Sequence, residues 1–74
     1  MYRITMTVHH GREYTATAEG TYPHEAFTHL MSKGLGAGYG PTGNYKRAVV
    51  LTELSRSGAA QHGWADYRME EVAV

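Results

Sequence analysis

The chain has 74 residues, of which 42% are hydrophobic, and it contains no cysteine. This length allows one small domain, residues 1–74, with a single core, and the lack of cysteine excludes disulfides and thiolate metal sites. Seven basic and seven acidic residues give a formal net charge of zero, so the chain has no basic excess to drive binding to nucleic acid.

Residues 2–20 alternate apolar and polar side chains in two runs separated by Gly11, which is typical of two half-buried strands. Both apolar sets share one face only if paired residue numbers have an even sum. A sum of 22 leaves residues 10–12 as the hairpin loop. This register predicts favourable pairs on the polar face: Arg3 with Glu19, Thr5 with Thr17, Thr7 with Thr15 and His9 with Glu13.

The following segment has the features of a short amphipathic helix. Thr21 is expected as the N-cap, and Pro23 suits the first turn because its missing N–H costs nothing there. Gly34 is expected to end the helix. Apolar side chains at helical spacing predict the face that packs on the sheet: Ala26, Phe27, Leu30 and Met31.

The second half of the chain predicts two more strands. Residues 46–54, KRAVVLTEL, are rich in β-branched side chains and predict a third strand. Residues 55–63 are expected to form a loop and residues 64–74 a fourth strand, although Trp64 and Tyr67 also suit a helix. A register sum of 118 would oppose Leu51 to Tyr67. The expected fold is α+β, an antiparallel sheet of about four strands with one helix packed on one face, in the order β-β-α-β-β.

The segment between the helix and residue 46 is rich in glycine, and Gly38, Gly40 and Gly43 have the spacing GxGxxG. A dinucleotide-binding loop needs a strand before it and a helix after it, whereas the predicted order here is reversed. A P-loop needs a lysine where this chain has Asn44. We therefore expect a connector, which either has no role of its own or serves as a contact surface.

The polar residues show no pattern typical of a metal site or a catalytic site. On a strand, the adjacent His9 and His10 would point to opposite faces, and His24 and His29 would lie about 140° apart around a helix. No serine, histidine and carboxylate form a local catalytic motif. We expect no metal, no cofactor and no enzymatic activity.

The segment TATAEGTYPHEAFTHLMSKG resembles the hairpin-then-helix half of HicB-type antitoxins at Gly20, Thr21, Glu25 and Ala26. It lacks the proline-containing segment that those antitoxins carry before the helix. The size and neutrality of the chain are also similar to those of small accessory proteins of phages and mobile elements. The resemblance to antitoxins implies an alternative function, a nucleic-acid-binding or RNA-contacting domain that uses Lys33, Lys46, Arg47 and Arg56 against phosphates.

The leading hypothesis is a small non-enzymatic protein-binding module, an adaptor or inhibitor that acts by surface contact. Tyrosine, tryptophan and arginine often carry most of the energy of an interface. The expected contact residues are Tyr39, Tyr45, Lys46, Arg47, Arg56 and Trp64. A homodimer through an unpaired sheet edge is a further possibility. No apolar run is long enough to span a membrane, and no signal sequence begins the chain, so a cytoplasmic location and no membrane partner are expected.

Overall fold

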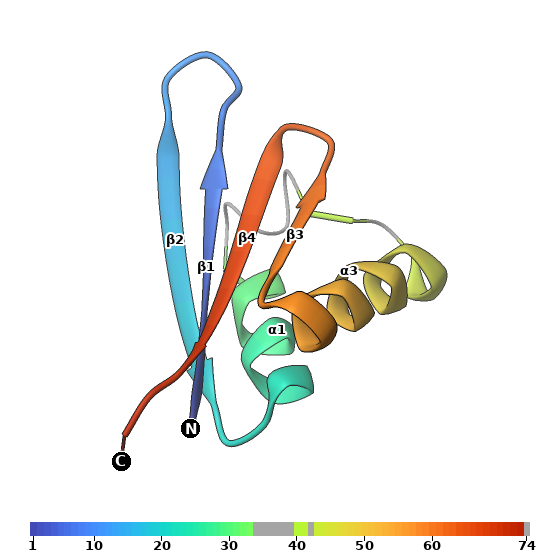
Figure 1. Ribbon diagram of the computed structural model, residues 1–74. Helices are drawn as coiled ribbons and strands as arrows, with labels where there is room; N and C mark the ends of the chain where they lie inside the picture. Colours follow the sequence, from blue (N-terminus) through green and yellow to red (C-terminus); the bar gives the residue numbers. More distant parts are fainter. Residues whose placement is uncertain (34–39, 42, 74) are drawn as a thin grey trace.

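A computed structural model describes residues 1–33, 40–41 and 43–73. Its elements follow the order β-β-α-α-β-β: β1 (Tyr2–Val8), β2 (Tyr14–Gly20), α1 (Pro23–Met31), α3 (Asn44–Ser57), β3 (Ala59–His62) and β4 (Ala65–Glu71) (Figure 1). The strands form one open antiparallel sheet in the order β2-β1-β4-β3. The predicted α+β class and four-stranded antiparallel sheet are confirmed, and α3 is an additional helix.

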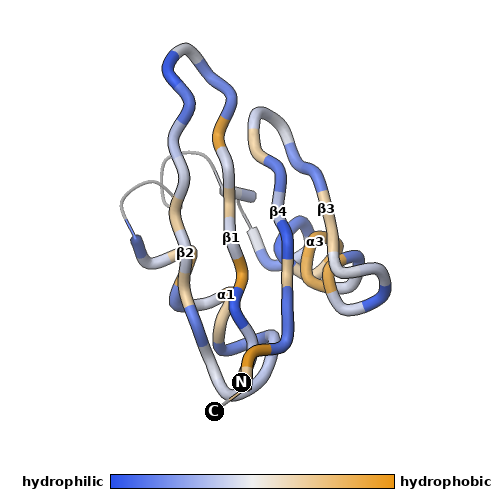
Figure 2. The backbone as a smooth tube through the Cα atoms, turned by 60° about the vertical axis from the view of Figure 1, so that its left-hand side comes forward, coloured by the Kyte–Doolittle hydropathy of each residue, from blue (hydrophilic) through white to orange (hydrophobic). Residues whose placement is uncertain are grey.

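The β1–β2 hairpin has the predicted register. Ile4 faces Ala18 on the side covered by the helices, and Arg3 faces Glu19 on the other side. The tip of this hairpin lies away from both helices and is hydrophilic (Figure 2). Alternation of side chains therefore determined both the strands and the way in which they pair.

Helix α1 buries the predicted face, Ala26, Phe27, Leu30 and Met31. Its N-cap is Tyr22 and not Thr21, and no side chain caps it. The Thr21 backbone N–H instead donates to Glu25 Oε1 at 2.8 Å. Gly34, the expected C-cap, lies outside the described residues.

The predicted third strand is wrong, because residues 44–57 form α3. Val50 and Leu54, one turn apart, are its buried residues, and Gly58 ends the helix with φ of 79°. The predicted loop is wrong as well, since its residues complete α3 and form β3. Strand propensity in a short β-branched run is a weak signal that tertiary packing overrides.

The last strand is confirmed, but its partner differs from the prediction. Strand β4 lies between β1 and β3, so that Tyr67 has Met6 on one side and Ala60 on the other. The register that opposes Leu51 to Tyr67 is wrong, because Leu51 lies in α3.

The two helices connect opposite edges of the sheet, because β2 and β3 are its edge strands. Helix α1 packs on β1 and β2, and α3 packs on β3 and β4. One core lies between the helices and the sheet and includes Ile4, Met6, Val8, Phe27, Leu30, Val50, Leu54, Ala65 and Tyr67. Met1 lies beside the end of β4, where the Val72 N–H donates to the Met1 carbonyl at 2.8 Å. In the described ranges, neither helix is long and apolar enough to cross a membrane.

Candidate functional site

The first half of α3 projects from the molecule. Residues 44–49 are all exposed, and burial begins only at Val50. Tyr45 is 82% exposed and Val49 is 51% exposed. Because these two residues are four positions apart, they lie on the same side of the helix. In Figure 1 this half of α3 runs outward beyond the sheet edge formed by β3.

A hollow of about 180 Å³ lies between α3 and β3, and we call it the α3–β3 groove. Apolar and polar side chains of both elements line it: Tyr45, Lys46, Val49, Val50 and Glu53 from α3, and Ala60, Gln61 and His62 from β3. The groove thus joins the projecting half of a helix to an edge strand of the sheet. It offers both apolar contact area and backbone groups to a ligand.

Two cations mark the start of α3. Lys46 and Arg47 lie in its first turn, which contains no acidic residue. Helix N-termini favour negative charge, so this arrangement is electrostatically unfavourable for the isolated helix. Arg47 Nε donates to the Pro41 carbonyl at 3.2 Å. In the described part of the chain, neither cation is paired with a carboxylate.

The other predicted contact residues lie elsewhere. Arg56 is in the last turn of α3, about 16 Å along the helix from Tyr45, and it donates to Glu53 Oε1 at 2.7 Å. Trp64 follows β3 and is 61% exposed, with its ring centroid 5.0 Å from that of His10. Tyr39 lies outside the described residues. Of the predicted contact residues, Tyr45 and Lys46 line the α3–β3 groove, whereas Arg47 lines the hollow between α1 and α3.

Val49 and the β3 residues that line the groove were not predicted from the sequence. Helical signals were present: Tyr45 and Val49 have i,i+4 spacing, as do Val50 and Leu54. Gly58, immediately after this run, is a typical helix end. These spacings are compatible with a helix, but the two adjacent valines also favour a strand, so the local sequence left both alternatives open.

A larger hollow of about 300 Å³ lies between α1 and α3. Phe27, Met31 and Leu51 are among the residues that line it, with Arg47 at one side. Met31 and Asn44, which also line it, lie on either side of residues 34–39 and 42, which the structure does not describe. This hollow is therefore not part of the candidate site.

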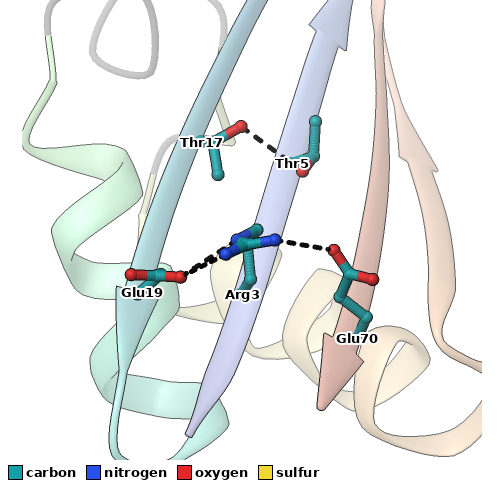
Figure 3. A network of polar contacts seen from close by, with 5 residues as sticks. All are labelled: Arg3, Thr5, Thr17, Glu19 and Glu70. Carbon is teal, nitrogen blue, oxygen red and sulfur yellow. Dashed lines mark hydrogen bonds and ion pairs between the residues drawn. The ribbon is translucent and has the colours of Figure 1, made fainter. Parts of the chain in front are cut away.

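The sheet face opposite the helices is polar. Figure 3 shows Arg3 between two carboxylates, with the helices behind the sheet. The Arg3 guanidinium lies 2.8 Å from Glu19 Oε2 and 3.4 Å from Glu70 Oε1. The hydrogen bond and charge of Glu19 raise the pKa of Arg3, with a smaller effect from Glu70. Exposed pairs of this kind contribute little to stability but align neighbouring strands.

His9 occupies a similar position at the other end of β1. Its Nδ1 lies 3.0 Å from Glu13 Oε2, and its Nε2 lies 2.9 Å from Asp66 Oδ2. The predicted pair of His9 and Glu13 is therefore formed. The two ring nitrogens contact different carboxylates on opposite sides. No group of three or more histidine, aspartate or glutamate side chains among the described residues is placed to hold a metal ion.

The predicted order of elements around the glycine-rich segment is wrong in its second half. A helix and not a strand begins at Asn44, with Gly43 as its N-cap at φ of 84°. The element before the segment is still a helix, α1, where a dinucleotide-binding fold has a strand. Gly38 lies outside the described residues. The order helix, segment, helix is thus neither the predicted order nor that of a dinucleotide-binding fold.

No family model, curated protein or solved structure matches this chain. The resemblance to HicB-type antitoxins accordingly depends on Gly20, Thr21, Glu25 and Ala26 alone. Any proposal about function must start from the surface of this molecule.

Proposed function

We propose that the chain is a small non-enzymatic protein-binding module, an adaptor or inhibitor, that contacts its partner through the first half of α3 and the α3–β3 groove. One observation carries the proposal, the joint exposure of Tyr45 and Val49 on one side of a projecting helix. Aromatic anchors beside an apolar hollow commonly supply most of the energy of an interface. Clustered exposed apolar groups with a polar rim are also typical of interaction sites.

Replacing Tyr45 by alanine tests this proposal. We expect Tyr45→Ala to keep the melting temperature of the native chain, because the side chain is 82% exposed. Binding to a partner, captured from host lysate and identified by mass spectrometry, should weaken by about 2 kcal/mol, roughly 30-fold. Titration of the purified pair measures the loss.

Tyr22→Ala is the matched control, since Tyr22 is 54% exposed and lies outside the groove. It should leave both stability and binding unchanged. A Tyr45→Ala variant that unfolds, or that binds the partner as tightly as the native chain, would contradict the proposal.

Lys46 and Arg47, neither of which is paired with a carboxylate among the described residues, support a second candidate, a nucleic-acid-binding domain of the antitoxin-like or RNA-contacting kind. Binding to phosphates releases counterions, so its affinity falls steeply with added salt. A titration with single-stranded RNA and duplex DNA at increasing salt separates the candidates. A steep negative slope favours nucleic acid, whereas the protein-binding proposal expects no measurable binding to either probe.

The proposal includes two further points. The edge strand β2 would allow a homodimer, which light scattering would detect. We also propose a cytoplasmic location without a membrane partner, which fractionation of expressing cells would test.

A further inference from the structure

We infer that the partner segment is an extended, acidic stretch of polypeptide that pairs with the free edge of β3 and fills the α3–β3 groove. This inference rests on the proposed function and adds the chemistry and conformation of the bound segment. It combines three features of the described residues: the backbone of β3, the projection of α3 and the charge at the start of α3.

The phase of the β3–β4 ladder determines which backbone groups face outward. The Met69 N–H donates to the Gly58 carbonyl at 2.8 Å, and the pairing continues from Ala59 to His62. Antiparallel ladders alternate, so Ala60 and His62 bond to β4 while Ala59 and Gln61 direct their backbone groups away from it. The Ala59 carbonyl accepts from Ser57 Oγ at 3.0 Å. Both groups of Gln61 and the N–H of Ala59 therefore face the position of a fifth strand.

The β3 edge lacks the side chains that usually block strand addition. Its sequence is Ala-Ala-Gln-His, with no proline, lysine or acidic residue. On the opposite edge strand, β2, the Glu19 carbonyl already accepts a hydrogen bond from His29 Nδ1 of α1 at 2.8 Å. We therefore place the added strand at β3.

Helix α3 completes the site. Its exposed half runs outward past β3 (Figure 1), and the groove lies in the angle between the two elements. A strand added to β3 would place every second side chain on the helix side of the sheet, against Val49 and Tyr45. Strand addition with pockets for alternate side chains is an established mode of peptide recognition. The bound segment should therefore be apolar at alternate positions.

The charges favour acidic residues at the remaining positions. Lys46 lines the groove, whereas Arg47 lines the hollow between α1 and α3, and within the described residues neither has a carboxylate partner. The carboxylate that lines the groove, Glu53, accepts hydrogen bonds from Arg56. A carboxylate at this end of α3 would also interact favourably with the helix dipole. A second copy of β3 would bring only alanine, glutamine and histidine to these cations. We therefore assign the edge to a foreign acidic segment and not to self-association.

Selection from a displayed random-peptide library, with the full chain as bait, tests the inference. We expect enrichment of peptides that alternate apolar and acidic residues. Their binding should protect the amides of Ala59 and Gln61 from hydrogen exchange. N-methylation of the peptide at alternate residues should weaken binding about tenfold or more, because it removes the N–H groups that pair with β3.

Two variants of the chain sharpen the test. Lys46→Glu should shift the selection from acidic to basic peptides, whereas Lys33→Glu makes the same charge change outside the groove and should not. Gln61→Pro should abolish peptide binding, because proline lacks the backbone N–H that would pair with the peptide. The variant should still fold, since proline is tolerated on an edge strand where the N–H faces away from the sheet. Circular dichroism checks the fold of this variant. If it does not fold, the N-methylated peptides still test whether the peptide backbone pairs with β3.

The outcomes separate this inference from the proposed function. Binding that needs Tyr45 but ignores N-methylation and Gln61→Pro would keep the function and overturn strand addition. Binding that needs neither Tyr45 nor the β3 edge would overturn both. Failure to enrich acidic alternating peptides would overturn the inference, as would a dimer in sedimentation experiments that Gln61→Pro dissociates.

Discussion

At the scale of single residues, Tyr67 is the least satisfied polar group of the core. It is only 1% exposed, and its ring packs against Phe27 with centroids 6.0 Å apart. Among the described residues its hydroxyl has no hydrogen-bond partner. Burial raises the pKa of Tyr67 to about 12, because the phenolate would lose its hydration.

Tyr67→Phe should therefore raise the free energy of unfolding by about 1 kcal/mol at neutral pH, since it removes an unpaired buried hydroxyl. The dependence of stability on pH in the alkaline range gives a second measurement. Because the pKa of Tyr67 is raised in the folded state, its ionisation leaves the free energy of unfolding unchanged below the ordinary value of 10.0 and lowers it increasingly as pH rises from there toward about 12. The phenylalanine variant should lack this loss.

Urea unfolding at neutral and alkaline pH measures both effects. Tyr22→Phe, at an exposed tyrosine, controls for the general effect of removing a hydroxyl. A Tyr67→Phe variant less stable than the native chain would show that the hydroxyl has a partner.

At the scale of elements, the start of α1 depends on one hydrogen bond. The Thr21 N–H donates to Glu25 Oε1, and this bond is the main cause that lowers the pKa of Glu25 from 4.5. The Glu25 carboxylate thus reaches back to the residue before the N-cap, much as the N3 carboxylate of a capping box accepts from the N-cap N–H. Thr21 was the predicted N-cap, because capping preferences depend on residue type and do not show at which residue the helical backbone begins.

Glu25→Ala should lower the melting temperature at neutral pH, because it leaves this N–H without its acceptor. The native carboxylate stabilises the fold above its ordinary pKa and loses this effect as pH falls through its lowered value. The difference between the two proteins should therefore shrink in acid. Glu25→Gln keeps an acceptor and should lie between them, and thermal unfolding across the acid range checks the order. A difference independent of pH would contradict the assigned role.

Helix α3 shows where element prediction failed. Two adjacent valines and a threonine favoured a strand, yet only Val50 and Leu54 are buried and half of the element projects from the fold. The candidate site lies on this projecting half. A protein-binding role for Tyr45 and Lys46 was expected from residue type, but the groove that they form with β3 needed the helix to be placed first.

At the scale of the whole molecule, the topology explains the wrong pairing of the last strand. The first and last strands, β1 and β4, are central neighbours, and the helices carry the chain from the β2 edge to the β3 edge. A short chain can enclose one core in this way because α1 and α3 cover one face of four strands. Nothing in the local pattern of residues 64–74 distinguishes β1 from residues 47–51 as the partner.

The sequence by itself determined the β1–β2 hairpin, its register, the buried face of α1 and the α+β class. These features depend on side-chain period and on residues near one another in the chain, such as Arg3 and Glu19 across one hairpin. Only the tertiary structure decided that residues 44–57 are helical, that β4 pairs with β1, and that Tyr45 and Val49 flank a groove beside β3. The physical reason is that burial depends on contacts between distant segments, which local propensity does not contain.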